Sequence, residues 1–282
     1  MILKKPFYVY PQVLLLLGLL CLSNCFADTT ASIYWQGSWQ QGSLLLGQVK
    51  PNHTVSHAGE QIQTTTDGYF LFGLGRNAQG LSTFVVGSPN GSEIKRQYKI
   101  AERDYQIQTV EGVPQRTVEP PASQLQRIRS DSVMVGKARQ AVTSDTDFLN
   151  GFIKPLVGPR TGVYGSQRVY NGVPKSPHYG VDYAAPTGTD VRAPASGIVR
   201  LAHRDLFYSG GTLVVDHGHG LTSTFLHLSD IVVAEGSRVE RGEIIAKVGS
   251  TGRATGPHLD WRMNWRNVRV DPELVLQALP AK

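Results

Sequence analysis

The sequence predicts a mainly β protein, with a small N-terminal β-sandwich, a linker helix and a C-terminal antiparallel β domain. Two observations support this fold class. The 282 residues include 30 glycines and 16 prolines, a content typical of turn-rich β proteins. Short apolar runs separated by glycine turns recur in both halves of the chain. With 40% hydrophobic and 18% charged residues, the chain is globular rather than disordered, and its length suits one or two domains.

Residues 1–27 are predicted to be a cleaved signal peptide. Two lysines precede an apolar run at 13–22, and the small residues Cys25 and Ala27 occupy the positions that a signal peptidase requires before a cut after Ala27. We therefore expect the mature protein to be periplasmic or secreted, without stable membrane insertion after cleavage. An uncleaved membrane anchor and a lipoprotein modified at Cys25 are the alternatives.

The cysteines and the net charge limit the possible chemistry. Cys21 and Cys25 both lie in the predicted signal peptide, so the mature chain would contain no cysteine and any metal site must use nitrogen and oxygen ligands. The formal net charge of +6 suits an anionic wall polymer. Because no arginine-rich run is interleaved with aromatic residues, we expect no nucleic-acid partner.

Residues 28–118 are predicted to form the β-sandwich. Apolar runs at 43–49 and 69–75 read as strands, and Thr66-Asp67-Gly68 is a turn signal between strand candidates. Through the segment 65–73, this region resembles the immunoglobulin-like sandwich of carboxypeptidase regulatory modules.

Residues 119–149 are predicted to contain a linker helix. Apolar residues recur among charged ones with a helical period, and Ser123 is the expected N-terminal cap. The apolar positions are Leu125, Ile128, Val133, Val135, Ala138 and Val142.

Residues 150–282 are predicted to form the second β domain. Its five apolar segments show no helical periodicity and are bounded by glycine turns, which favours a mainly antiparallel sheet. The segments are 196–202, 210–218, 221–229, 242–249 and 258–265.

The last of these segments alternates strictly between polar and apolar residues. His258, Asp260, Arg262 and Asn264 fall on one face, and Leu259, Trp261, Met263 and Trp265 fall on the other. The apolar face must be packed, so the polar face is expected to line a wet surface. Neighbours on it lie ~6.5 Å apart along the strand, close enough to converge on one ion or substrate.

Two further segments offer groups of the same chemistry. Strand alternation places His227 on the face that carries Phe225. His178 and Asp182 are suitable zinc ligands, but a straight strand would hold them ~13 Å apart. The chain is therefore expected to bend between them, and Gly180 is where a bend or bulge is tolerated.

Three motifs together resemble the lysostaphin-type zinc metallopeptidases. They are 178–199 (HYGVDYAAPTGTDVRAPASGIV), 225–229 (FLHLS) and 249–261 (GSTGRATGPHLDW), and they follow one another in the order and at the separations of that family. The resemblance covers roughly residues 155–275. It implies a compact antiparallel β fold with a groove across one sheet and zinc at the floor of the groove.

The resemblance also implies the roles of individual residues. His178 and Asp182 would be zinc ligands, and His227 and His258 would be the two catalytic histidines. The family's third ligand is a histidine at the position of Asp260, and the glutamate that it often carries two residues later is Arg262 here. Aspartate is a competent zinc ligand, so we expect one zinc per chain. Arg262 is expected to pair with Asp260 or to contact substrate.

The function that follows is an exported zinc-dependent endopeptidase that hydrolyses the peptide cross-links of bacterial peptidoglycan. Its partners would be peptidoglycan peptide stems, with the bond from D-Ala to meso-diaminopimelate favoured over pentaglycine bridges. The alternatives are a catalytically inactive relative that binds the wall or activates another hydrolase, and an adhesion protein acting through its sandwich. The oligomeric state is left open.

The remaining histidines are not expected to act in catalysis. His53, His57 and His203 are predicted to be solvated surface residues. His217 and His219, which lie in a glycine-rich turn, are predicted to be structural or exposed rather than a second metal site.

Overall fold

The computed structural model describes residues 32–110 and 122–282. The predicted signal peptide, with Cys21 and Cys25, lies outside the described residues, as does the predicted sandwich boundary at residue 118. Within the described ranges, no helix is both long enough and apolar enough to cross a membrane.

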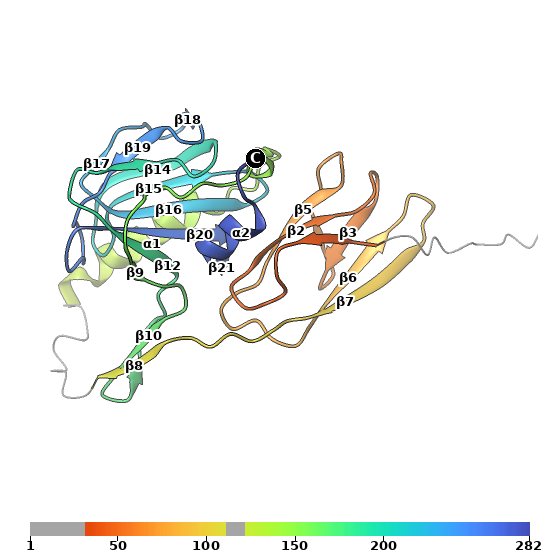
Figure 1. The fold of residues 1–282 in the computed structure, drawn as a ribbon, viewed down its shortest axis with the longest axis horizontal. Helices are drawn as coiled ribbons and strands as arrows, with labels where there is room; N and C mark the ends of the chain where they lie inside the picture. Colours follow the sequence, from red (N-terminus) through yellow and green to blue (C-terminus); the bar gives the residue numbers. More distant parts are fainter. Residues whose placement is uncertain (1–31, 111–121) are drawn as a thin grey trace, which may run out of the picture.

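Two small antiparallel sheets form the N-terminal unit (Figure 1). One has the order β1 (Tyr34–Gln36), β2 (Leu44–Gln48), β5 (Tyr69–Gly73), and the other has the order β4 (Glu60–Ile62), β3 (Thr54–His57), β6 (Leu81–Gly87), β7 (Glu93–Lys99). Aromatic rings fill the space between them, with Trp35 in edge contact with Phe70 and Phe84 at 5.2 Å. The predicted strands are therefore present, and the predicted turn places Gly68 at φ 82°.

The C-terminal unit is built on one large sheet, and the prediction of a mainly β fold is confirmed. The order is β18 (Arg238–Val239), β14 (Gly197–Leu206), β15 (Gly210–Asp216), β16 (Leu221–Leu228), β20 (His258–Trp265), β12 (Gly180–Ala184), β9 (Arg160–Gly162), and β21 (Val268–Val270) pairs with β20. A small sheet of β13 (Asp190–Arg192), β19 (Ile244–Lys247) and β17 (Asp230–Ile231) completes this unit.

A fourth small sheet links the two parts of the chain. After β7, the chain runs away from the sandwich into β8 (Ile107–Val110), as Figure 1 shows. This strand pairs in parallel with β10 (Gln167–Tyr170), which is antiparallel to β11 (Val173–Pro174). Strand β8 is thus held by the C-terminal half of the chain and not by the sandwich sheets.

The predicted linker helix is present as α1 (Leu125–Ala138), preceded by a 3₁₀ turn at Ala122–Gln124. Ser123 is not its cap, because this residue lies inside the 3₁₀ turn; the capping position is Gln124, whose side chain makes no capping hydrogen bond. The helix packs its last turn, through Val135 and Ala138, on a buried cluster of Leu201, Leu206 and Val214 from β14 and β15. A second 3₁₀ turn follows at Asp147–Asn150.

The sequence analysis did not identify the short helix α2 (Pro272–Ala278) at the C-terminus. Its signal is present in the sequence, since Asp271 caps the helix by accepting a hydrogen bond from the Glu273 backbone N–H, and Pro272 occupies its first position. Seven residues were too few for a helical period to be visible.

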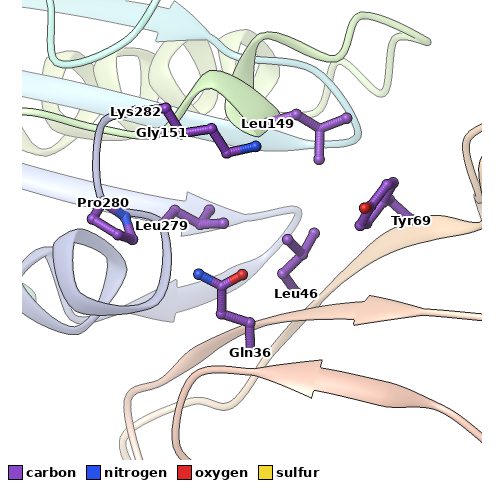
Figure 2. A pocket seen from close by; sticks show the side chains of 8 residues that line it. All are labelled: Gln36, Leu46, Tyr69, Leu149, Gly151, Leu279, Pro280 and Lys282. Carbon is purple, nitrogen blue, oxygen red and sulfur yellow. The ribbon is translucent and has the colours of Figure 1, made fainter.

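The two units share one hydrophobic core. Phe72 of β5 lies 5.5 Å from Trp265 of β20 between ring centroids, and a Cβ at Gly73 would lie 3.2 Å from Trp265, so the strands meet closely. A cavity of about 130 Å³ between the units is lined by Leu46 and Tyr69 on one side and by residues near the C-terminus on the other (Figure 2). The sandwich is therefore a packed part of the structure.

Of the histidines predicted to be solvated, His53 is buried and His57 is half-buried. His53 is 9% exposed, and its Nδ1 lies 3.2 Å from the Pro51 carbonyl. His57 packs on the rings of Phe72 and Phe84, at 4.7 and 5.0 Å. The expectation failed because these apolar neighbours come from β5 and β6, which are distant in sequence.

Replacing Arg103 should test the polar contact between the two units. Its Nη1 donates to Asp271 Oδ2 at 3.0 Å, and the Asp271 side chain is only 6% exposed. Because Arg103→Ala would leave this carboxylate without its charged partner, we expect the free energy of unfolding to fall by about 1–3 kcal/mol. Urea denaturation would measure the change. Arg96→Ala, which removes an exposed arginine of β7, is the control, and an equal effect of both variants would contradict the role of this pair.

Candidate metal site

Three of the predicted site residues form a compact cluster of possible metal ligands. The ligand atoms of His178, Asp182 and Asp260 all lie within 4.8 Å of one another, and the described residues contain no second group of this kind. His178 Nε2 is 3.1 Å from Asp182 Oδ1 and 3.5 Å from Asp260 Oδ2. His178 Nε2 and Asp182 Oδ1 are both buried, and the contact between them does not have the geometry of a hydrogen bond.

The large sheet brings the two carboxylates together. Asp182 on β12 stands directly opposite Asp260 on β20, so both side chains project from the same face. His178 lies ahead of β12, where its backbone N–H donates to the Ser166 carbonyl at 2.8 Å. His178 Nδ1 lies 3.2 Å from the Val163 carbonyl, which can only accept, so the neutral ring presents Nε2 to the carboxylates.

Gly180 has a different role from the predicted one. The strand begins at this residue and pairs regularly with Arg262, so the change of direction comes before it. A Cβ at Gly180 would lie 2.3 Å from Asp260 Oδ1 and 2.7 Å from Arg262 Cγ. Glycine is needed there because the side chains of β20 fold over the backbone of β12.

Asp260 and Arg262 form a bidentate ion pair. Arg262 Nε donates to both carboxylate oxygens at 3.0 Å, and Nη2 donates to Oδ2 at 2.5 Å. Asp260 is 3% exposed. Burial by itself would raise its pKa, but Arg262 and His178 hold the pKa of this carboxyl well below its usual range. Asp260 is therefore ionised at any ordinary pH.

The two carboxylates also control the charge of His178. Burial would lower its pKa, yet Asp182 and Asp260 raise the pKa to about 10 when no cation is present. The cluster is thus a strong site for positive charge, and a proton on Nε2 stands where a cation can bind.

His227 reaches the site through a β-bulge. The pairing of β15 with β16 shifts register between Gly211 and Leu213, and His227 has a left-handed φ of 63°. The expectation that His227 lies on the same strand face as Phe225 was wrong, because the bulge interrupts the alternation between these two residues. The bulge turns the ring toward His258, with the two centroids 4.8 Å apart.

Both rings of this pair are oriented by backbone carbonyls. Nδ1 of His227 lies 2.8 Å from the Thr251 carbonyl, and Nδ1 of His258 lies 2.8 Å from the Gly256 carbonyl. A carbonyl only accepts, so each Nδ1 carries the proton and each neutral ring has a free Nε2. Burial lowers the pKa of His227, which favours its neutral form.

The apolar face of β20 is packed as predicted, since Leu259, Trp261 and Met263 are fully buried. The polar face is less wet than expected, because Asp260 and Asn264 are only 3% and 2% exposed. Arg262 covers Asp260, and helix α1 packs on the same face of the sheet over β14 and β15.

The other histidines lie outside the cluster. His217 is buried between the Ser196 carbonyl and the Ser223 hydroxyl, at 2.8 and 2.9 Å. His219 is buried beside Phe148, with ring centroids 5.1 Å apart, so both residues are structural and neither is exposed. His203 is half-exposed on β14.

The family comparison agrees with this arrangement. Residues 176–272 match the model of Peptidase family M23, and this segment contains all five predicted ligands and histidines together with Arg262. Residues 176–272 form an M23 domain. The predicted resemblance to the lysostaphin-type peptidases is thereby confirmed.

Curated relatives match about a third of this chain. The DD-carboxypeptidase/endopeptidase Mpg of Neisseria meningitidis is 45% identical over 103 residues, which are 36% of this chain and 23% of the relative. The peptidoglycan DD-endopeptidase ShyA of Vibrio cholerae is 42% identical over 88 residues, which are 31% of this chain and 20% of the relative. The matched part thus spans less than a quarter of these proteins.

A solved structure matches almost the whole chain. A peptidase M23 crystal structure from Pseudomonas aeruginosa has a TM-score of 0.66 and 27% identity, covering 86% of this chain and 97% of that one. The likeness therefore extends beyond the M23 domain to most of the chain.

Sequence reasoning missed three kinds of residue around the site. The first is Gly162, which approaches Asp182 so closely that a Cβ would lie 2.1 Å from Oδ2. The second is Thr251, whose carbonyl orients His227. The third is a pair of arginines, Arg139 and Arg269, near Arg262. Gly162 lies before the three motifs, and only its pairing opposite Asp182 shows what it contacts.

Substituting Gly180 should disturb the site directly. The Cβ of Gly180→Ala would overlap Asp260 Oδ1, so we expect a loss of about 1–3 kcal/mol in the free energy of unfolding. Gly256→Ala is the matched control, because a Cβ at that position meets nothing within 4 Å. Denaturant titration of both variants checks this. A Gly180→Ala protein as stable as the control would show that β12 can move away from Asp260.

Proposed function

We propose that this protein is a zinc-dependent endopeptidase that cuts peptide cross-links of bacterial peptidoglycan. The observation that carries the proposal is the cluster of His178, Asp182 and Asp260 inside an M23 domain, with the rings of His227 and His258 beside it. The activities after which the relatives from Neisseria meningitidis and Vibrio cholerae are named support the same substrate class.

The residues present fit a zinc ion. Nε2 of His178 and Oδ1 of Asp182 are buried and lack hydrogen-bond partners, as ligand atoms aimed at a cation would be. One imidazole and two carboxylates are ligands that zinc accepts, and His178, Asp182 and Asp260 would hold it. Arg262 would orient Asp260 from behind through the other lone pairs of its carboxylate. In such a site, zinc supplies Lewis-acid polarisation of the scissile carbonyl and activation of water.

His227 and His258 would handle the protons of the reaction. His227 is neutral near pH 7, because burial lowers its pKa, so its free Nε2 can take a proton from the attacking water. His227 would then pass this proton to the leaving amine. His258, at 4.8 Å between ring centroids, would hold the neighbouring position and, when its Nε2 is also protonated, would donate to the developing oxyanion. The backbone carbonyls of Thr251 and Gly256 keep both rings in the required tautomer.

The finer features of the function follow the sequence analysis. We propose export through residues 1–27 and action in the periplasm or outside the cell, because the proposed substrate lies there. The bond from D-Ala to meso-diaminopimelate is the proposed target, and its support is the Vibrio cholerae relative, which is a peptidoglycan DD-endopeptidase.

Metal analysis of variants should separate ligands from proton carriers. Ala substitution of His178, Asp182 or Asp260 should abolish the content of about one zinc per chain, whereas Ala at His227 or His258 should keep zinc and lower kcat by about 10²–10⁴-fold. His203→Ala, outside the cluster, should change neither quantity. Elemental analysis and kinetics measure both. A fully active, zinc-loaded Asp260→Ala protein would exclude Asp260 as a ligand.

Digestion of purified peptidoglycan tests the activity itself. The full chain should release peptides with new termini at the D-Ala to meso-diaminopimelate bond, and removal of metal by a chelator should reduce this release at least about 100-fold. Mass spectrometry of the products identifies the bond. Absence of products from the zinc-loaded protein would instead support the inactive, wall-binding alternative.

A further inference from the structure

Three arginines from separate elements gather beside the metal cluster. Arg262 lies on β20, and Arg269 lies on β21 opposite Asn264, the next residue on the same face of β20. Arg139 ends α1, whose last turn packs on Val214 of β15. Val214 stands opposite Thr224, which in turn stands opposite Arg262, so α1 covers the same face of the sheet. We call Arg139, Arg262 and Arg269 the arginine cluster.

Two members of the arginine cluster, Arg139 and Arg269, have no acidic partner among the described residues. Arg262 is paired with Asp260, as described above. Within residues 32–110 and 122–282, the Arg269 guanidinium contacts the Asn264 side-chain oxygen at 3.3 Å and lies 5.7 Å from the ring of Tyr179. The guanidinium of Arg139 makes no hydrogen bond or ion pair with any described residue, although the side chain is half-buried. Two half-buried cations are thus uncompensated, which is costly unless an anion joins them.

The charges within the arginine cluster affect one another. Burial lowers the pKa of Arg139 to about 10, and Arg262 contributes to the same shift. Burial lowers the pKa of Arg269 to about 9, with Arg139 and Arg262 adding their repulsion. All three remain charged near neutral pH, so an anion would relieve a repulsion that the protein otherwise sustains.

The strand floor beneath the arginine cluster has unused hydroxyls. Thr222 and Thr224 lie on β16 opposite Asn264 and Arg262, so they share this face. They are 0% and 2% exposed, and neither Oγ1 has a hydrogen-bond partner. Buried hydroxyls are normally satisfied, so these two also indicate a polar occupant near this face.

We propose that the arginine cluster binds a free carboxylate of the substrate peptide, close to the bond that is cut. Guanidinium groups match carboxylates in a planar, bidentate geometry, and Arg262 already shows this geometry with Asp260. Asp260 and Arg262 are adjacent positions on one face of β20, and such positions lie ~6.5 Å apart. This distance equals about two residues of extended peptide. A peptide bound at the metal cluster could therefore reach Arg262 and the other members of the arginine cluster. This inference rests on the proposed peptidase function.

The substrate class is then a peptide whose leaving side carries an unblocked carboxylate. In a link from D-Ala to the side-chain amine of meso-diaminopimelate, the carbon that bears the scissile nitrogen also bears a carboxylate. A pentaglycine bridge has no charge at that place. The arginine cluster would therefore favour the first substrate over the second by holding its leaving group.

Two synthetic cross-linked peptides test this directly. They differ only in whether that diaminopimelate carboxylate is free or amidated. For the zinc-loaded full chain, we expect amidation to lower kcat/KM at least about tenfold. The ratio of kcat/KM for the free peptide to that for the amidated peptide should fall toward one in Arg269→Gln and Arg139→Gln. Arg139→Lys should retain part of the wild-type ratio. Arg96→Gln on the distant β7 is the control and should keep the full ratio.

A binding measurement separates this inference from the proposed function. Calorimetry would compare the tripeptide L-Ala-γ-D-Glu-meso-diaminopimelate, with the same carboxylate free or amidated, on the wild type and on both Gln variants. Arg-dependent preference for the free acid supports the subsite even if no peptide is cleaved. Equal cleavage of the two peptides, with equal binding of the two tripeptides, would overturn it while leaving the peptidase intact. If the free and amidated peptides are cleaved equally and the wild type binds inorganic phosphate, the arginine cluster is a site for another anion, and the proposal is likewise overturned.

Discussion

The ion pair between Asp260 and Arg262 is the contact on which the polar face of β20 depends. A carboxylate that is 3% exposed needs a charged partner, and Arg262 supplies it through both oxygens. The side chains of this pair lie across the backbone of β12, which is why residue 180 is glycine. The same pairing leaves Asp260 ionised and turned toward His178, so the position of one proposed ligand follows from a neighbour that is not itself a candidate ligand.

This ion pair also stands between two regions of opposite character. On one side, Asp182 and Asp260 attract a cation strongly enough to raise the pKa of His178 to about 10. On the other side, Arg139 and Arg269 attract an anion. A peptide substrate presents both requirements, since its carbonyl needs an electrophile and its carboxylate needs a cation. The separation of the charges along one strand would align such a substrate before any bond changes.

The sequence predicted the strands well where the information was local, and three residues that it singled out, His178, Asp182 and Asp260, lie together in the structure. The apolar segments at 210–218, 221–229 and 258–265 became β15, β16 and β20 because strong alternation or a continuous apolar run needs no distant partner to be recognised. The orientation of His227 could not be predicted, because the bulge exists only in the pairing of β16 with β15. Arg139 reaches the site from a helix more than a hundred residues before Arg262, and no local pattern marks that contact.

The shared core of the two units has a consequence for shortened forms of the protein. Phe72 and Trp265 face each other across the boundary, and Val270 packs against Gly73 there. An M23 domain produced without the sandwich would expose this apolar patch to water. Large exposed patches of that kind promote self-association. The sandwich thus acts as a solubilising cover for one flank of the M23 domain, whatever else it binds.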